Sequence, residues 1–359
     1  MKPSHFYFDE KILEKEQILF NQCRYLAHEL LVDPAQGHNY YCLPQEDEAR
    51  VLIHNKQGIE LYNNICRHRQ AVMLRGSGNA ANIVCPLHGW TYDMHGKLLG
   101  APDFDPCPER HLQQHSVQSW NGLLFEKSAV DIVSSLNEIK LKSQFDFSGY
   151  VFHSRREHVC NYNWKTFIEV YLDDYHVRPF HPGLGHFVDC KDLNWQFGER
   201  FSVQSVGICN KLQTPGTEVY KRWHRELMRY RRGAVPEYGA IWLTIYPNIM
   251  VEWYPEVLVV STLWPEGPQR TRNIVEFYYP EEIAHFEADF VEAHQAAYME
   301  TCDEDDEIAE RMDRGRRHLA KTSLDDYGPV HDPMELGLNY FYKYYNQWIF
   351  HDWTQRPKL

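Results

Sequence analysis

Two short cysteine–histidine motifs constrain this chain more than any other feature. The first is Cys66-x-His68 and the second is Cys85-x-x-His88, with the glycine-rich stretch RGSGN between them. Two thiolates and two imidazoles are soft-to-borderline ligands, and they suit either zinc or an iron–sulfur centre. Spacing alone does not separate these two kinds of site, so a structural zinc site stands as the alternative.

The overall composition restricts the domain organisation, the partners and the location that can be expected for this chain. A chain of 359 residues favours two unequal domains over one. The formal net charge of -13, with no basic arm, argues against nucleic acid as a partner. The N-terminal stretch MKPSHFYFDEKILEKEQ is too charged for a secretory signal, and no apolar run reaches the length of a membrane span. We therefore expect a cytoplasmic protein without a membrane partner, whose nine cysteines are reduced thiols rather than a disulfide framework.

The first third of the sequence predicts a helix followed by a small β region. Apolar residues at roughly helical spacing favour one amphipathic helix over 8–31, with Asp9 placed to cap it. After Pro34 the pattern changes to short alternating runs. One of them, ARVLIHNKQGIELYNNIC, has a glycine between two strand-like halves and predicts a hairpin. We expect the β region to end near Phe125.

The remaining sequence predicts helices combined with an antiparallel sheet. A polar segment over 129–149 is expected to connect two domains, and 161–177 has a helical pattern. Another helix is expected from Pro280 to about Lys321, interrupted or bent around Cys302. Five strand-like runs separated by proline and glycine predict an antiparallel meander, namely SVQSVGICNKL, YGAIWLTIYP, NIMVEWYP, EVLVVSTLWP and RNIVEFYYP.

The residues around the first two motifs resemble a Rieske [2Fe-2S] domain. The similarity comprises Cys-x-His, the loop glycines, and Cys-Pro-x-His-Gly-Trp followed by TYDMHGKLLGAP. It implies that Cys66 and Cys85 hold one iron and that His68 and His88 hold the other. Neutral imidazoles in place of two thiolates raise the reduction potential of such a cluster, so that it accepts electrons from a ferredoxin or flavin donor. We favour this interpretation over structural zinc because ligands, glycines and flanking residues agree.

Two details of the cluster loops indicate which branch of the Rieske family the chain resembles. Respiratory Rieske proteins carry an extra cysteine in each loop, whereas Ala71 and Leu87 occupy those places here. The chain is therefore similar to the oxygenase or ferredoxin branch. Gln70 stands where the family usually has glycine, so the first loop is expected to differ in shape.

A second motif, NWKTFIEVYLDDYHVRPFHP, contains candidate ligands for another metal. On a helix, Asp173 and His176 are three residues apart and share a face, whereas His181 would need the chain to turn back near Pro179. Two histidines and one carboxylate, with open positions, form the facial triad that binds non-haem Fe(II). A histidine pair alone is weak evidence, since buried histidines often only satisfy hydrogen bonds in a core.

Three parts of this motif, NWK, DxYH and HP, resemble in their order the catalytic domain of Rieske non-haem iron oxygenases. The resemblance implies a mononuclear Fe(II) held by His176, His181 and the aspartate of a Glu-Asp pair on a late helix. We expect that aspartate to be Asp305. Asp303 and Asp306 are rivals, because the run CDEDDE also fits a solvated helix start.

Asp173 receives a different role from the same resemblance. In the family, an acidic residue at this place is not an iron ligand but hydrogen-bonds an iron-binding histidine, here His176, and a cluster histidine of an adjacent subunit. Such a carboxylate orients imidazoles and offers a short route for an electron and a proton.

The resemblance covers nearly the whole chain and implies an α+β fold. A small all-β Rieske domain over 37–128 would be inserted into a helix-grip (START-like) catalytic domain over 129–359, with the helix of 1–36 packing on the catalytic part. The implied activity is that of a terminal oxygenase. It uses O2 and electrons from a separate NAD(P)H reductase or ferredoxin to mono- or dihydroxylate, or to demethylate, a small organic substrate that is expected to be aromatic. A homotrimer is implied as well.

Three alternatives remain at this point. One is a monooxygenase acting on a quaternary ammonium or methylated amine compound. Another is a Rieske electron carrier without oxygenase activity, and the third is a zinc-stabilised ligand-binding protein. The aromatic residues Trp242, Tyr246, Trp253 and Tyr254 fit a pocket for a flat ring, a cage for a quaternary ammonium, or the core of a sheet.

Overall fold

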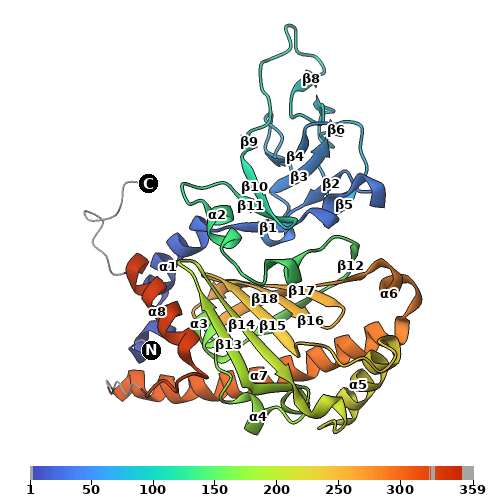
Figure 1. Cartoon of the computed structure of the whole chain (residues 1–359). Helices are drawn as coiled ribbons and strands as arrows, with labels where there is room; N and C mark the ends of the chain where they lie inside the picture. The colour runs from blue at the N-terminus through green and yellow to red at the C-terminus, as the bar shows by residue number, and fades with distance from the viewer. Residues whose placement is uncertain (1–2, 323, 325–327, 350–359) are drawn as a thin grey trace. The chain divides into compact units, whose positions relative to one another are not determined.

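The computed structural model describes residues 3–322, 324 and 328–349, and its chain forms two compact units (Figure 1). The larger unit comes from Met1–Gln22 and Ser134–Leu359, and the smaller one is Cys23–Val133. Among the helices of the described residues, none has the length and apolar character needed to cross a membrane.

The smaller unit consists of antiparallel strands in three sheets. Their strand orders are β5-β2-β3-β4-β9, β6-β7-β8 and β1-β11-β10. The hairpin expected from the sequence is present as β3 and β4, which pair from Arg50 with Asn63 to Asn55 with Gly58. The strands are β1 (Tyr25–His28), β2 (Tyr40–Cys42), β3 (Arg50–Asn55), β4 (Gly58–Asn63), β5 (Ser77–Gly78), β6 (Ile83–Val84), β7 (Thr91–Tyr92), β8 (Leu98–Gly100), β9 (Gln114–His115), β10 (Val117–Trp120) and β11 (Leu123–Glu126).

The N-terminal helix is shorter than the sequence predicts. Helix α1 covers Glu10–Gln22, and Oδ1 of Asp9 accepts a hydrogen bond from the backbone N–H of Lys11, as a capping residue does. The expected continuation to residue 31 is wrong, because Tyr25–His28 forms β1, which pairs with β11 and is buried at every position. The smaller unit therefore begins before residue 37.

The larger unit is built on one seven-stranded antiparallel sheet with the order β12-β18-β17-β16-β15-β14-β13. The expected meander is confirmed, since β14 to β18 are neighbours in sequence order. The strands are β12 (Tyr150–Cys160), β13 (Val188–Phe197), β14 (Phe201–Ile208), β15 (Ala240–Ile245), β16 (Ile249–Tyr254), β17 (Val257–Gly267) and β18 (Arg270–Pro280). The remaining helices are α2 (Ile132–Asn137), α3 (Trp164–Tyr171), α4 (Val177–Phe180), α5 (Glu218–Tyr230), α6 (Glu281–Phe286), α7 (Ala288–Thr322) and α8 (Leu336–Ile349).

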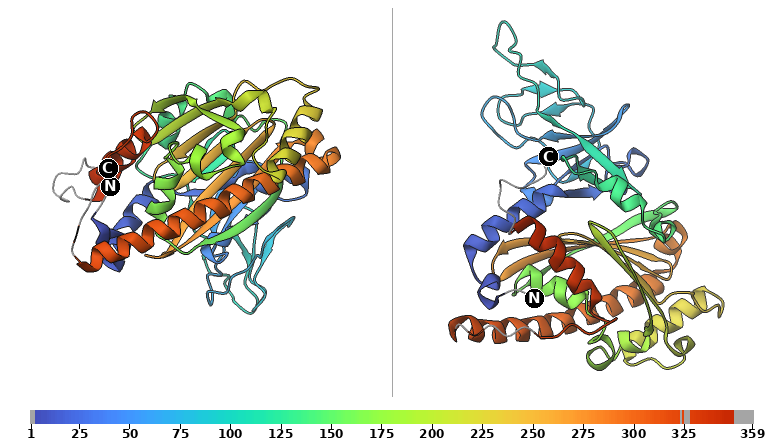
Figure 2. Two further views of the ribbon diagram at one scale, coloured as in Figure 1. Left: turned by 90° about the horizontal axis from the view of Figure 1, so that it is seen from below. Right: turned by 60° about the vertical axis from the view of Figure 1, so that its left-hand side comes forward.

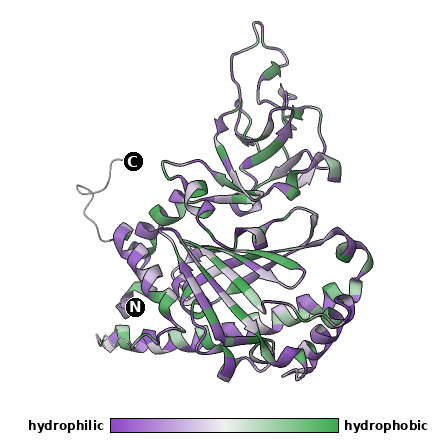
Figure 3. Ribbon diagram, in the orientation of Figure 1, coloured by the Kyte–Doolittle hydropathy of each residue, from purple (hydrophilic) through white to green (hydrophobic). Residues whose placement is uncertain are grey.

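Helix α7 runs across one face of this sheet (Figures 1 and 2). Alternate strand residues such as Val257, Val259 and Phe277 face it and pack in one core cluster with Phe290 and Ala297 of α7. The strands accordingly contain many hydrophobic residues, whereas hydrophobic and hydrophilic residues alternate along α7 (Figure 3). This packing fixes which face of α7 points toward the sheet.

The expected interruption near Cys302 is wrong, because α7 is continuous through it. The helical run breaks earlier, at Glu287, whose backbone leaves helical geometry (φ -120°, ψ 55°) between α6 and α7. No proline occurs between Ala288 and Thr322, and the helix packs on the sheet both before Cys302, at Phe290 and Ala297, and after it, at Ala309. The packing of α7 on the sheet stabilises the helix more than repulsion among the carboxylates of the acidic run destabilises it.

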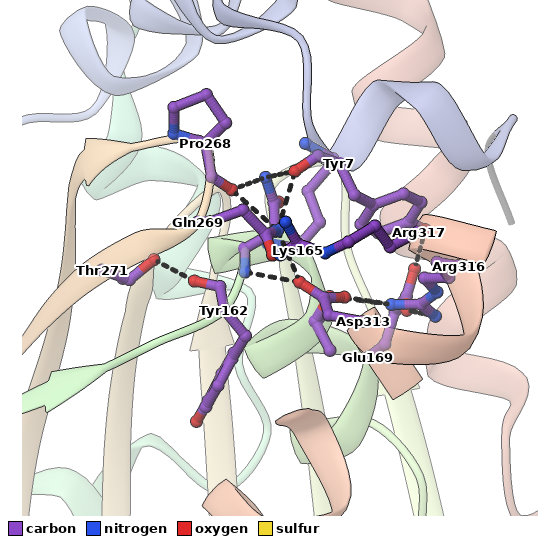
Figure 4. Close-up of polar contacts among 12 residues, drawn as sticks. Tyr7, Tyr162, Lys165, Glu169, Pro268, Gln269, Thr271, Asp313, Arg316 and Arg317 are labelled. Carbon is purple, nitrogen blue, oxygen red and sulfur yellow. Dashed lines mark hydrogen bonds and ion pairs between the residues drawn. The ribbon is translucent and has the colours of Figure 1, made fainter. Parts of the chain in front are cut away.

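A buried carboxylate joins α7 to the start of α3 (Figure 4). Asp313 is only 2% exposed. Its Oδ2 accepts hydrogen bonds from the backbone N–H of Asn163 (2.9 Å) and from Gln269 (2.8 Å). Its Oδ1 accepts from Thr166 (2.6 Å) and from Arg316 (3.3 Å). These bonds set the helix that leads into the second motif against the helix that carries the acidic run.

Replacing Asp313 with alanine is expected to destabilise the larger unit strongly. The change removes the acceptor of four hydrogen bonds and leaves buried donors unsatisfied, each at a cost of about 1–3 kcal/mol. Arg316 keeps its ion pair with Glu169. Chemical denaturation measures the change in unfolding free energy. The control is Glu310→Ala on the exposed face of the same helix, expected to stay within about 0.5 kcal/mol of the unaltered protein. Equal stabilities of the two variants would contradict the proposed link.

Candidate functional site

The two loops that carry the cysteine–histidine motifs make the same turn. The backbone carbonyl of Cys66 accepts from the N–H of Gln70, and that of Cys85 accepts from the N–H of Gly89, both at 3.0 Å. Gln70 and Gly89 have φ values of 60° and 70°. Gln70 thus adopts the left-handed conformation that glycine favours, at some steric cost, and the first loop keeps its turn without glycine.

These loops bring together, in the smaller unit, the four side chains proposed from the sequence as cluster ligands. Cys66 and Cys85 are 1% and 3% exposed and belong to the core of that unit. The rings of His68 and His88 lie 4.8 Å apart, and His68 stacks on Trp90 at 5.0 Å. Nδ1 of His68 is buried without a hydrogen-bond partner. Two thiols and an unpartnered imidazole nitrogen fit a cluster that binds both kinds of donor.

The second motif is not one continuous helix. Helix α3 ends at Tyr171, so the expectation that Asp173 and His176 share a helical face is wrong. A turn brings them together instead, because Oδ1 of Asp173 accepts from the backbone N–H groups of Tyr175 (2.7 Å) and His176 (3.2 Å). The short helix α4 follows, with His176 before its first residue and His181 after its last.

Three side-chain atoms converge at the ends of α4. Nε2 of His176 lies 3.0 Å from Nε2 of His181, and Oδ1 of Asp305 lies 3.0 Å from His181 Nε2 and 3.4 Å from His176 Nε2. Two imidazole nitrogens and a carboxylate oxygen this close suit a shared cation, and the donor set is that of a facial triad. The residues present therefore fit a mononuclear iron.

The rival acidic residues point elsewhere. Asp303 is exposed. Asp306 faces β12, where its carboxylate accepts from Nε2 of His158 (2.5 Å) and from the hydroxyl of Tyr162 (2.7 Å). His158, Cys160 and Asp306 form a second group of possible metal donors within 4.8 Å of one another. In the part of the chain that the structure describes, Asp305 is the residue of the acidic run that contacts both His176 and His181 through Nε2.

Two further carboxylates lie next to the Nδ1 atoms of the two converging histidines. Oδ2 of Asp173 lies 3.4 Å from Nδ1 of His176, and Oε2 of Glu304 lies 2.6 Å from Nδ1 of His181. A partner at Nδ1 orients an imidazole and presents Nε2 to a metal. The position of Asp173 could be predicted from the sequence, but the contact of Glu304 could not, because spacing alone does not tell which side of α7 meets His181.

The charges of this group depend on one another. Burial favours a higher pKa for Asp305, but His176 and His181 outweigh burial and hold the pKa below its usual value. Burial favours a lower pKa for His176, but the neighbouring carboxylates of Asp173 and Asp305 raise it to about 10. A metal cation binding here displaces protons that the carboxylates otherwise retain on the histidines.

A cavity of about 80 Å³ opens beside the three converging groups. His176, His181 and Asp305 are part of its wall. Of the four aromatic residues considered from the sequence, Trp242 and Tyr254 line it. The other two do not, since Tyr246 packs in a separate core cluster and Trp253 lies edge-on to Tyr238. The cavity is also lined by residues that no motif in the sequence indicates, namely Tyr171, Asp174, Trp223, Glu252, His294 and Tyr298.

Comparison with known proteins finds a family match for each part of the chain. The family described as "Rieske [2Fe-2S] domain" matches residues 25–120, and "Ring hydroxylating alpha subunit (catalytic domain)" matches 147–351. A putrescine 2-hydroxylase of Ralstonia nicotianae is 56% identical over 347 residues, covering 96% of this chain and 94% of that protein. A putrescine 2-hydroxylase of Bordetella bronchiseptica is 50% identical, covering 96% and 84%. A solved quaternary ammonium Rieske monooxygenase has a TM-score of 0.76 at 20% identity, covering 96% of this chain and 94% of its own.

Proposed function

This chain belongs to the ring-hydroxylating α subunits of Rieske oxygenases, and from that premise we propose that it hydroxylates a small aliphatic diamine of the putrescine class. The observation that carries the proposal is the 56% identity, over nearly the full length of both chains, to a putrescine 2-hydroxylase. A diamine replaces the aromatic substrate expected from the sequence. A methylated or quaternary amine remains the alternative.

The size and charge of the cavity support a small cationic substrate. Its volume of about 80 Å³ is far below the roughly 300–1,000 Å³ typical of pockets for drug-sized ligands. Among the described residues that line it there is no lysine or arginine, whereas Asp174 and Glu252 add carboxylates to those near the converging histidines. Burial lowers the pKa of His294 to about 3, so this imidazole is neutral at physiological pH. The wall therefore favours a cation.

We assign the metal-binding roles from the donor sets of the two sites. A Rieske cluster and a mononuclear iron are the cofactors of this kind of enzyme. The proposed cluster ligands are Cys66, Cys85, His68 and His88. The proposed ligands of the mononuclear iron are His176, His181 and Asp305. When bound, the two iron centres supply the electron transfer and oxygen activation of the reaction.

The side chains of this chain hold the ligands and shield the reaction. Asp173 and Glu304 orient the imidazoles of His176 and His181 from behind. Aromatic residues of the cavity exclude water and hold the substrate carbon near the open side of the triad. In the overall reaction one oxygen atom of O2 enters a C–H bond to give C–OH, and the other becomes water. Two electrons and two protons are consumed, and a separate reductase or ferredoxin provides the electrons.

Assembly belongs to the same proposal. We propose a homotrimer in which Asp173 lies between His176 of one subunit and a cluster histidine of the next. The family resemblance supports this arrangement, and so does the position of Asp173, 3.4 Å behind His176. Sedimentation of the purified protein would measure its oligomeric state.

Putrescine is expected to support oxygen uptake and to gain one oxygen atom. The assay combines the iron-loaded protein with a ferredoxin, a ferredoxin reductase and NADPH, and it follows oxygen consumption and product mass. Choline and naphthalene serve as comparison substrates, and both are expected to give little product because neither is a small dication. Uptake with choline or naphthalene but not with putrescine would overturn the proposed substrate class.

A further inference from the structure

Glu252 is a buried carboxylate in the cavity wall with no cationic neighbour. It lies on β16 and is 3% exposed. Its two oxygens accept hydrogen bonds from the hydroxyls of Tyr254 and Tyr298, each at 2.9 Å, and Trp242 donates in turn to Tyr254 at 3.0 Å. Among the described residues, the side chains that act on the charge of Glu252 are Tyr254, Tyr298 and Asp305, none of which is a cation.

Asp174 is a second buried carboxylate in the same wall, with the imidazole of His176 as a neighbour. It is also 3% exposed, and its Oδ2 is buried without a hydrogen-bond partner. The hydroxyl of Tyr171, another wall residue, is likewise buried and without a partner. Buried polar atoms are nearly always hydrogen-bonded in folded proteins, so these two atoms indicate a missing donor.

Both carboxylates are costly to hold in the fold without a counter-charge. Removing an ionised carboxylate from water is strongly unfavourable unless a cation and hydrogen-bond donors replace the water. For Glu252, burial raises the pKa to about 7 even though Tyr254 and Tyr298 act in the opposite direction. A ligand that brings positive charge and N–H donors would offset this cost.

We propose that Glu252 and Asp174 each pair with one ammonium group of an α,ω-diamine, and that this double pairing selects diamines over monoamines. The inference rests on the proposed function and names the residues that recognise its substrate. Tyr254 and Tyr298 hold the carboxylate of Glu252 in place and offer aromatic faces to the cation. Tyr171 provides a further acceptor for an N–H group.

The hydrogen-bonding chemistry distinguishes primary from quaternary ammonium groups. A quaternary nitrogen has no N–H and leaves Oδ2 of Asp174 and the hydroxyl of Tyr171 without a donor. A primary ammonium has three N–H groups and satisfies such acceptors while neutralising the charge. Because the wall contains two buried carboxylates, a dication fits it better than any monocation.

The test measures binding separately from turnover. Putrescine and 1-aminobutane are titrated by calorimetry, without oxygen, into the iron-loaded full-length protein and its variants. Glu252→Gln and Asp174→Asn are each expected to weaken putrescine binding by about 10- to 100-fold. For 1-aminobutane, which can still use the other carboxylate, we expect a change within about 3-fold. Glu199→Gln, at an exposed position, removes a matched surface charge and is expected to change neither affinity.

The possible outcomes separate this inference from the proposed function. If the unaltered protein binds and hydroxylates putrescine but both carboxylate variants keep its preference for putrescine over 1-aminobutane, the inference is wrong and the function stands. If the unaltered protein does not bind putrescine, both fail. Equal weakening of both amines would also overturn the inference, because the residues would then only shape the cavity.

A milder variant keeps the test decisive if a carboxylate variant does not fold. Tyr298→Phe retains the ring but removes one hydrogen bond to Glu252. It is expected to weaken putrescine binding by about 3- to 10-fold and to leave 1-aminobutane nearly unchanged. Unchanged affinity for putrescine in this variant would count against Glu252 as an ammonium partner.

Discussion

Replacing Asp305 with alanine is expected to remove the mononuclear iron, leave the Rieske cluster in place and abolish hydroxylation. Oδ1 of Asp305 lies 3.0–3.4 Å from Nε2 of both His181 and His176, and it is the charged member of the proposed ligand set. Without it, two neutral imidazoles face the cation, and the loss should exceed the roughly 10- to 100-fold that removal of a supporting residue costs in metal affinity. Elemental analysis should find only cluster iron, with the visible absorption of the cluster retained.

Two neighbours in the same helix provide graded controls. Asp303→Ala changes an exposed residue of the acidic run and should keep both iron and activity. Glu304→Gln removes the charge 2.6 Å behind His181 and should weaken metal binding by about 10- to 100-fold without removing a ligand. Full iron content and normal turnover in Asp305→Ala would refute the proposed triad.

The candidate metal-binding side chains could be proposed from the sequence because their signals are local. Cys66 and His68 lie in one tight turn, as do Cys85 and His88, so spacing and flanking glycines carry most of the information. His176 and His181 are similarly close in the chain. Their spacing in the sequence indicated a shared site, although the helix predicted there is instead a turn anchored by Asp173.

Structure that depends on contacts between residues far apart in the chain could not be predicted in the same way. Periodicity could not show that Tyr25 pairs with Phe125 in a strand, because the apolar spacing of 8–31 also fits a helix. It could not show either that α7 continues through Cys302, which depends on contact with the sheet. Tertiary packing decided both cases, and the local pattern alone predicted the wrong outcome.

The cavity wall illustrates the same limit for substrate recognition. Glu252 sits between Val251 and Trp253 in a strand with no motif around it, and Asp174 adjoins an aspartate with a different role. Their joint significance arises only when β16 and the turn before α4 face one cavity. A partial signal did exist, since a charged residue in an otherwise apolar buried strand is uncommon unless something pairs with it.

Replacing Cys85 with alanine is expected to remove the Rieske cluster while leaving the mononuclear iron site intact, with complete loss of reductase-dependent turnover. The side chain is 3% exposed, and its backbone is held by hydrogen bonds to Trp90 and Gly89, so alanine should keep the loop but remove a thiolate ligand. Three remaining donors cannot complete a cluster that needs two on each iron. The protein should lose its visible absorption and its acid-labile sulfide.

The matched control for this variant is Cys107→Ala, which changes an exposed cysteine of the same unit. It should retain colour, sulfide and turnover, because a free surface thiol contributes to neither iron centre.

Iron analysis separates the two sites, since Cys85→Ala should keep the mononuclear iron that Asp305→Ala loses. Retention of the cluster in Cys85→Ala, or its loss in Cys107→Ala, would contradict the proposed ligand set. The two centres lie in units with separate cores, so damage to one set of ligands should leave metal binding at the other unchanged.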